Sequence, residues 1–236
     1  MRFNNKINCT DCENSNCFIK KHCLDNIKQS VTIHENKFVN RYSKNQLIFM
    51  EGNFVDSINF IQSGRVKVFK KGAFGKDQII RLISDGEILG HRGLSDAEKF
   101  SISATSITDS MICSFDKAFF FKLLKTTPEL TFNLMLYFAN ELNHEENKLR
   151  DLSIFNVREK VAKALLIMIN AYGLNKKNEI NHAHELSRQD IAELVGLNSN
   201  QVTKILADLK EDNILETDNK TIKIINLNSL KEIVNI

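Results

Sequence analysis

No run of apolar residues in this sequence approaches the ~20 that a membrane span requires. The first residues, MRFNNKINC, also lack the apolar core and the small-residue cleavage site of a secretory signal. We therefore expect a cytoplasmic protein without a membrane partner. In that compartment structural disulfides are rare, and clustered cysteines are more often metal ligands or redox sensors.

Excess positive charge and catalytic motifs are also missing. The net charge is +3, and the region from Arg150 to the end has twelve basic and twelve acidic residues. Nucleic-acid binding must therefore be argued from a motif and not from bulk charge. No nucleophile elbow or phosphate loop is present, and only one of the six histidines, His91, lies among the glycine motifs of the strand-like region. A cupin-like enzyme needs a cluster of histidines inside its barrel, and the strand-like region has no such cluster. We therefore do not expect this protein to be an enzyme.

The length of 236 residues predicts two domains. Between Phe38 and Phe115, short apolar runs alternate with turn residues, and seven of the nine glycines fall in this region. Many short strands at regular spacing predict a sandwich or a small barrel. Pro128 fits the first turn of a helix, which we expect to extend to about Phe155.

Residues of this helix step by three and four, which is the heptad seam of a dimer helix. The seam positions are Met135, Phe138, Leu142, Glu145, Leu149 and Leu152. The same pattern also fits an apolar face packed on the chain's own strands. Glu145 is unusual in a seam, because two glutamates that face each other in a dimer cost free energy. Either Glu145 points to solvent, or it keeps the dimer marginal so that a signal can tip it.

The segment from Leu186 to Leu215, LSRQDIAELVGLNSNQVTKILADLKEDNIL, predicts two helices joined by a tight turn, a helix-turn-helix. The pairs Ser187/Asp190 and Asn198/Gln201 predict the helix caps, and a β-hairpin should follow as a wing. The candidate DNA contacts are polar side chains suited to base edges and phosphates: Ser187, Arg188, Asn198, Ser199, Asn200, Gln201, Thr203 and Lys204. A plain helical hairpin with a solvated polar face is the alternative.

Four motifs in this order resemble the CRP/FNR superfamily of bacterial transcription regulators over essentially the whole chain: EGNFVDSINFIQSGRVKVF, DGEILGHRGL, NVREKVAKALL and LSRQDIAELVGL. The resemblance implies an α+β fold. It would contain a double-stranded β-roll of the jelly-roll, cyclic-nucleotide-binding-like type, a long dimerisation helix and a C-terminal winged helix-turn-helix. The expected domains are a cysteine-rich segment (1–30), the β-roll sensor (31–127), the dimerisation helix (128–155) and the DNA-binding domain (156–236). The implied partners are a second copy of the chain, palindromic promoter DNA and RNA polymerase.

The cyclic-nucleotide branch of this superfamily holds its ligand with a glutamate and an Arg-Ser/Thr pair. His91 stands at the position of that glutamate, and Phe100 and Ser101 stand at the positions of the pair. Without the arginine, an anionic phosphate would be desolvated without a charge partner. We therefore do not expect this chain to bind cAMP.

Four of the five cysteines lie within CTDCENSNCFIKKHC, Cys9 to Cys23. The FNR branch carries an oxygen-labile 4Fe–4S cluster on an N-terminal cysteine trio and one distant cysteine, and the resemblance matches Cys9, Cys12, Cys17 and Cys113 to these ligands. The spacing between Cys12 and Cys17 is one residue shorter than in the branch, and Cys23 is an alternative third ligand. The resemblance implies that oxygen, redox state or nitric oxide controls dimerisation and promoter binding, with Glu145 as a brake.

Other interpretations of the cysteines stay open. The four N-terminal cysteines could form a zinc site by themselves, and Cys113 could be a small buried apolar residue. The thiols could also act directly as a thiol/disulfide sensor. A regulator without a cluster could instead bind a small-molecule effector in its β-roll.

Overall fold

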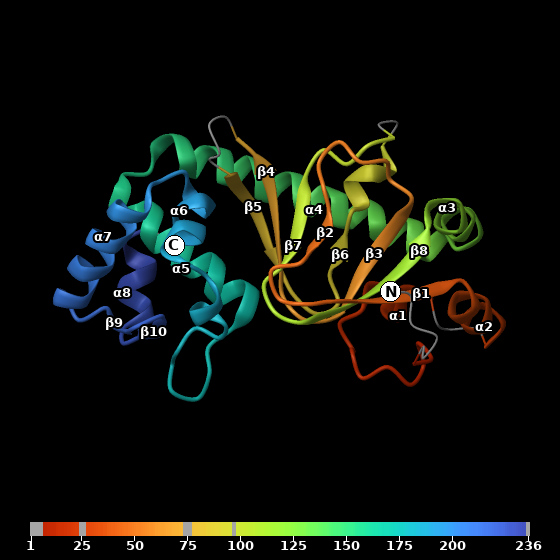
Figure 1. Ribbon diagram of the computed structural model, residues 1–236, viewed down its shortest axis with the longest axis horizontal. Coiled ribbons are helices and arrows are strands. Elements are labelled where there is room, and N and C mark those ends of the chain that lie inside the picture. Colours follow the sequence, from red (N-terminus) through yellow and green to blue (C-terminus); the bar gives the residue numbers. More distant parts are fainter. Residues whose placement is uncertain (1–6, 24–26, 73–76, 96–97, 235–236) are drawn as a thin grey trace. The chain divides into compact units, whose positions relative to one another are not determined.

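The structure, a computed structural model, describes residues 7–23, 27–72, 77–95 and 98–234. The chain forms two compact units. One comprises Met1–Val68 and Ile83–His144, and the other comprises Phe69–Leu82 and Glu145–Ile236. Figure 1 shows the strands and the long helix α4 (Pro128–Ile154).

Eight strands in the described part of the N-terminal half form two four-stranded sheets, with the orders β1-β8-β3-β6 and β2-β7-β4-β5. Their bounds are β1 Lys37–Tyr42, β2 Leu47–Phe49, β3 Ser57–Ser63, β4 Val66–Lys71, β5 Asp77–Ile83, β6 Ile88–Leu89, β7 Ser103–Ser106 and β8 Ser110–Asp116. Each apolar run of the sequence that predicted a strand lies in one of them. A 3-10 turn, η2 (His91–Leu94), follows β6.

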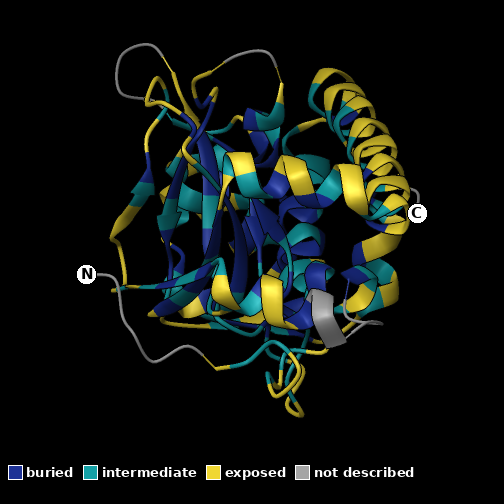
Figure 2. Ribbon diagram, turned by 90° about the vertical axis from the view of Figure 1, so that its right-hand side faces the viewer, coloured by how far each residue is buried: buried dark blue, intermediate teal, exposed yellow. Residues whose placement is uncertain are grey.

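Strand β8 lies between β1 and β3 and pairs with both in antiparallel register. Cys113 faces Val39 of β1 and Phe60 of β3 across the strands. Because neighbouring residues of a strand point to opposite faces, Cys113 and Phe115 share one face of this sheet with Lys37 and Phe60. In the N-terminal half most of the buried residues lie in these strands; buried residues are drawn dark blue in Figure 2.

Two short helices belong to the same unit, α1 (Phe18–Cys23) and α2 (Ile27–Glu35). Ile19 and Cys23 of α1 are buried in the apolar core that also holds Phe60 and Phe115. The helix α3 (Lys117–Thr126) follows β8 directly and adds Phe120 to this core. Apolar packing of α1 in this core therefore holds the cysteine segment, which precedes α1, close to the sheet.

The C-terminal part begins with α5 (Val157–Tyr172), which Asn156 and Glu159 cap and Gly173 ends. The remaining elements are η3 Ala183–Glu185, α6 Arg188–Val195, α7 Ser199–Glu211, β9 Leu215–Asp218, β10 Thr221–Ile224 and α8 Leu227–Glu232. The predicted wing is the antiparallel β9–β10 hairpin. The predicted fold class, with a β-sheet domain, a long helix and a helix-turn-helix, is confirmed.

One buried carboxylate fixes the end of α4 to α5. Asp151 is buried and pairs with Lys163 of α5 at 2.9 Å and with Arg150 at 2.7 Å. Burial alone would raise the pKa of Asp151, but the hydrogen bonds and positive charges of Lys163 and Arg150 hold this pKa below its ordinary value. The carboxylate therefore stays ionised and holds the two helices together.

Candidate functional site

Four cysteines from two distant parts of the chain line one cavity. Cys9, Cys12 and Cys17 come from the irregular segment before α1, and Cys113 comes from β8. The other lining residues are Asn14, Ile19, Lys20, Lys37, Phe60, Ile61, Gln62 and Phe115. The structure thus brings together the four residues that the sequence selected as first-choice cluster ligands.

The cavity is an environment in which the thiols interact with one another and with a buried cation. Burial raises the pKa of Cys113 to about 12; the ammonium of Lys37 opposes this effect, and Cys17, Cys9 and Cys12 add to it. Burial also raises the pKa of Cys17. Both thiols are therefore protonated at neutral pH in the metal-free protein, and they must release their protons to ligate a metal.

Cys23 lies elsewhere. It is 2% exposed, it belongs to the apolar core, and it does not line the cavity. No group of three or more His, Cys, Asp or Glu side chains in the described ranges is arranged to hold a single metal ion. Cys23 is thus separate from Cys9, Cys12 and Cys17, and the described structure does not arrange all four N-terminal cysteines around one ion. A 4Fe–4S cluster places its four ligands around a larger core, so it does not require four sulfurs around one ion.

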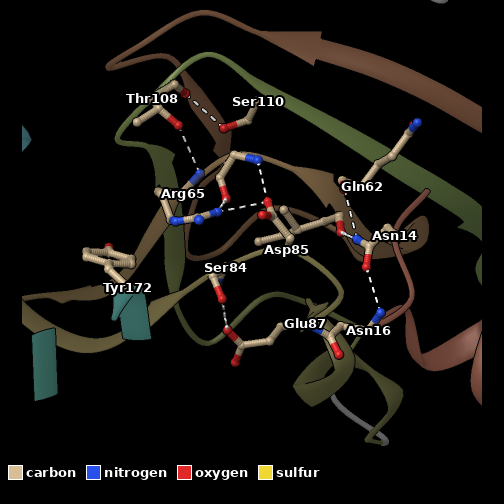
Figure 3. Close-up of polar contacts among 12 residues, drawn as sticks. Asn14, Asn16, Gln62, Arg65, Ser84, Asp85, Glu87, Thr108, Ser110 and Tyr172 are labelled. Carbon is tan, nitrogen blue, oxygen red and sulfur yellow. Dashed lines mark hydrogen bonds and ion pairs between the residues drawn. The ribbon is translucent and has the colours of Figure 1, made fainter. Parts of the chain in front are cut away.

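The cysteine segment is fixed to the sheet by polar contacts, of which those of Asn14 are shown in Figure 3. The Asn14 side chain donates to the main-chain oxygens of Ile61 at 3.1 Å and Gln62 at 2.8 Å. The Asn14 side-chain oxygen accepts from the Asn16 amide at 3.0 Å, and the Phe18 amide donates to the Gly86 carbonyl at 3.3 Å. The segment is therefore bound to β3 and to the turn before β6 by the protein alone.

Gly86→Ala should loosen this segment. A Cβ at Gly86 would lie 2.5 Å from the Asn16 carbonyl carbon, and Gly86 has a φ of +92°. Gly52 is a matched control, because its φ is +89° and no atom lies within 4 Å of its Cβ position. We expect Gly86→Ala to destabilise the docked segment by about 1–3 kcal/mol beyond Gly52→Ala. Hydrogen exchange of residues 9–17 measures this difference, and equal exchange in the two variants would contradict the contact.

The long helix α4 leaves its seam uncovered in the single chain. Of the fourteen exposed large hydrophobic residues in the described ranges, seven lie on α4, among them Met135, Phe138, Leu142 and Leu149. Leu152, by contrast, is partly buried, and Leu130 and Leu134 are the α4 residues packed in the core. An exposed apolar row of this size is typical of an interaction surface.

The cysteine segment also contacts this helix. Phe18, which follows Cys17, lies 5.9 Å from Tyr137 of α4 between ring centroids. Tyr137 in turn lies 5.2 Å from His91 and 6.5 Å from the seam residue Phe138. A chain of aromatic contacts therefore runs from a cavity cysteine to the seam.

The helix-turn-helix has the predicted caps, and these caps use two of the predicted DNA contacts. The Asn198 side chain accepts from the Gln201 amide, and Gln201 Oε1 accepts from the Asn198 amide at 3.1 Å. Asn200, Thr203 and Lys204 are exposed on α7, whereas Ser199 and Gln201 are partly buried. Asn200 and Lys204 are four residues apart and so lie on one face of the helix. This face presents an amide and a cation to solvent.

The remaining predicted contacts lie at the start of α6. Ser187 caps α6 through Asp190 in a reciprocal capping box. Arg188 donates to the Asn219 carbonyl in the β9–β10 turn at 3.4 Å. Arg188 therefore connects the helix-turn-helix to the wing.

Comparisons with known proteins agree with these two parts. Residues 39–127 match the cyclic nucleotide-binding domain, and residues 159–233 match the Crp-like helix-turn-helix domain. A CRP-like cAMP-activated global transcriptional regulator of Mycobacterium tuberculosis is 27% identical over 183 residues, which cover 78% of this chain and 82% of the relative. The anaerobic regulatory protein of Bacillus subtilis is 26% identical over 179 residues, 75% of each chain. The chain belongs to the CRP/FNR family of transcription regulators.

The structure of FixK2 from Bradyrhizobium japonicum has the same fold, with a TM-score of 0.74 and 23% identity over 84% of this chain and 97% of that one. CRP/FNR regulators bind DNA and act as dimers, and they are not enzymes, so the expectation of a non-enzymatic regulator is confirmed. None of the helices in the described ranges has the length and apolar character to cross a membrane.

The positions matched to the ligand-holding glutamate and the Arg-Ser/Thr pair of the cyclic-nucleotide branch are filled differently here. His91 is buried, with Nε2 3.3 Å from the Glu141 carboxylate of α4. Phe100 is buried and stacks on Phe49 at 3.9 Å. The cavity beside Phe100 has two carboxylates in its lining, Asp56 and Asp116, and no lysine or arginine among the described lining residues. The described lining of this cavity therefore offers a phosphate no charge partner.

Sequence reasoning missed several residues of the cysteine cavity. Lys37 is buried, and its Nζ lies 2.5 Å from the Ile7 carbonyl and 3.4 Å from Cys9 Sγ. Gln62 Oε1 lies 3.6 Å from Cys113 Sγ, and Lys20 Nζ lies 2.6 Å from the Cys12 carbonyl. These residues reach the cavity through strand pairing and loop docking, and no motif in the sequence indicates either.

Proposed function

We propose that this CRP/FNR regulator senses oxygen, redox state or nitric oxide through a 4Fe–4S cluster held by Cys9, Cys12, Cys17 and Cys113. The cluster would control dimerisation and thereby binding to promoter DNA. The support is that four thiols from two distant segments line one cavity. Four cysteine thiolates are the usual ligand set of such a cluster.

The donor set fits the group. All four lining cysteines supply sulfur, and the ammonium of Lys37 lies 3.4 Å from Cys9 Sγ, where a positive charge would balance an anionic cluster. When bound, the cluster supplies iron–thiolate bonds that oxygen or nitric oxide can break. These bonds would join the segment before α1 to β8 more firmly than the contacts of Asn14 and Gly86 alone.

The chain's own residues would carry the signal to the dimer helix. Cys17 positions Phe18 against Tyr137 of α4, and Cys113 lies in β8, which continues into α3 and then α4. When the cluster holds both Cys17 and Cys113, α4 would present Phe138 and Leu142 in register for a second copy. Glu145 would oppose this pairing until the cluster is present, because two like charges meet in the seam.

Direct thiol/disulfide sensing is less well supported. The five cysteines form no disulfide with one another. The reactive form of a cysteine is the thiolate, and burial raises the pKa of Cys17 and Cys113 so that both are protonated at neutral pH.

The name of the relative from Bacillus subtilis, an anaerobic regulatory protein, fits an oxygen-labile cofactor.

For DNA we propose that a dimer reads a palindrome with its two α7 helices about one turn, ~34 Å, apart. Asn200 and Lys204 would contact base edges, with Ser199 and Thr203 beside them. Asn198, Gln201 and Ser187 would mainly hold the helix starts, and Arg188 would position the wing. RNA polymerase is the proposed partner at the promoter.

Iron and acid-labile sulfide analysis of protein purified without oxygen tests the proposal. We expect about four of each per chain, together with a brown colour. Anaerobic gel filtration should show dimers that become monomers after exposure to air. Zinc without sulfide would contradict the cluster, and an air-exposed, metal-free protein that is already dimeric and binds DNA equally well would contradict the switch.

A further inference from the structure

Two lysines in the lining of the cysteine cavity contact the loop that holds Cys9 and Cys12. Lys37, on β1, is 3% exposed, and its Nζ donates to the Ile7 carbonyl and to Cys9 Sγ. Lys20, on α1, donates to the carbonyls of Cys12 at 2.6 Å and Thr10 at 3.5 Å. Both lysines line the cavity together with the four cysteines.

A buried lysine needs a reason, because an ammonium taken out of water without a partner is strongly disfavoured. The described lining of the cavity contains no carboxylate that could neutralise Lys37 or Lys20. The groups in this lining that can carry negative charge are the four cysteine sulfurs, when they ligate a cluster.

The charges balance when a cluster occupies the cavity. Four thiolates and an oxidised 4Fe–4S core carry a formal charge of about −2. The two ammonium groups bring the total to about zero, so the site needs no counter-ion from solvent. One added electron makes the site negative, and the lysines reduce the energy of this step because they are close and partly desolvated.

We propose that Lys37 and Lys20 are the electrostatic partners of the cluster and set its reduction potential. This inference rests on the proposed function. Lys37 has the larger effect, because it is more deeply buried and donates directly to a ligand sulfur. Hydrogen bonds to the sulfurs and net charge are two of the factors that set the potential of an iron–sulfur cluster. Both lysines are positioning residues and not ligands.

The test compares the full chain purified without oxygen with its variants Lys37→Met and Lys20→Met. A mediated titration with dithionite, followed by visible absorbance, measures the potential at which the site takes up one electron. We expect both variants to have lower potentials than the wild-type protein, with the larger shift in Lys37→Met. Lys37→Arg keeps the positive charge, so its reduction potential should be close to that of the wild-type protein.

Lys21→Met is the matched control. Lys21 lies beside Lys20 on α1, but its Nζ contacts Asn16 and it does not line the cavity. The reduction potential of the Lys21→Met variant should equal that of the wild-type protein. An unchanged potential in Lys37→Met and Lys20→Met at full iron content would overturn the inference and leave the proposed function intact. A wild-type protein without iron and sulfide would overturn both.

A purely structural role of the lysines gives a different result. In that case both methionine variants would lose iron in proportion to their loss of folding, and the remaining clusters would keep the wild-type potential. If Lys37→Met retains no iron, the result for Lys37→Arg decides between a structural and an electrostatic role. Iron content and potential close to wild type in Lys37→Arg support the charge, and loss of the cluster in this variant as well overturns the inference.

Discussion

Cys113→Ala is expected to abolish iron and sulfide binding in anaerobic protein, whereas Cys23→Ala retains both. Cys113 would supply the ligand from β8, and without it the cavity has three sulfurs, all from the segment before α1. Outer-shell changes already lower metal affinity about 10–100-fold, so loss of a ligand should lower iron retention by more than about 100-fold. Iron and sulfide per chain, measured after anaerobic desalting, give the result.

The pair of variants separates ligation from packing. Cys23 is the more deeply buried of the two, so Cys23→Ala removes more apolar contact and should cost more folding stability than Cys113→Ala. Iron loss, by contrast, should be larger in Cys113→Ala than in Cys23→Ala. Loss of the cluster from Cys23→Ala with retention in Cys113→Ala would show that the assignment of the third and fourth ligands is wrong.

The choice between Cys17 and Cys23 depended on a local detail that spacing does not show. Helix α1 begins at Phe18, so Cys17 stays in the loop while Cys23 falls within the helix. Ile19 and Cys23 are four residues apart and therefore lie on one face, which is buried. The apolar spacing of Ile19 and Cys23 could have been read from the sequence, but only with the start of this short helix known.

Caps and turns followed from the sequence because they involve residues a few positions apart. The capping boxes at Ser187 and Asn198 and the end of α5 at Gly173 are of this kind. The sequence predicts both a cap role and a base-reading role for Gln201, and the structure shows Gln201 in the cap. Lys37 and Gln62 reach Cys113 only through the pairing of β1, β3 and β8, and long-range pairing leaves no local signal.

Leu142→Glu is expected to prevent dimerisation even when the cluster is intact. Leu142 is 61% exposed in the single chain and occupies the centre of the α4 seam. Burial of a leucine contributes about 1.5–3 kcal/mol, and a dimer would lose two of them. The dimer dissociation constant should therefore rise by at least about 100-fold. Anaerobic gel filtration over a concentration series measures this constant, and affinity for promoter DNA should fall with it.

Asn140→Glu is the control for the added charge. Asn140 is exposed on α4 two residues before Leu142, at the heptad position opposite the seam. Its substitution should leave both the dimer and the iron content unchanged. If Leu142→Glu still dimerises as the wild type does, α4 does not form the dimer interface.

Glu145→Ala should shift the same equilibrium in the opposite direction. Removing the glutamate from the seam removes the like-charge contact between two copies, so metal-free, air-exposed protein should form dimers that the wild type does not. The double variant Leu142→Glu/Glu145→Ala should be monomeric, because the apolar contact that drives pairing is absent. A metal-free Glu145→Ala protein that remains as monomeric as wild type would mean that Glu145 points to solvent. The cluster would then have to act on α4 by another route, through Phe18 and Tyr137 alone.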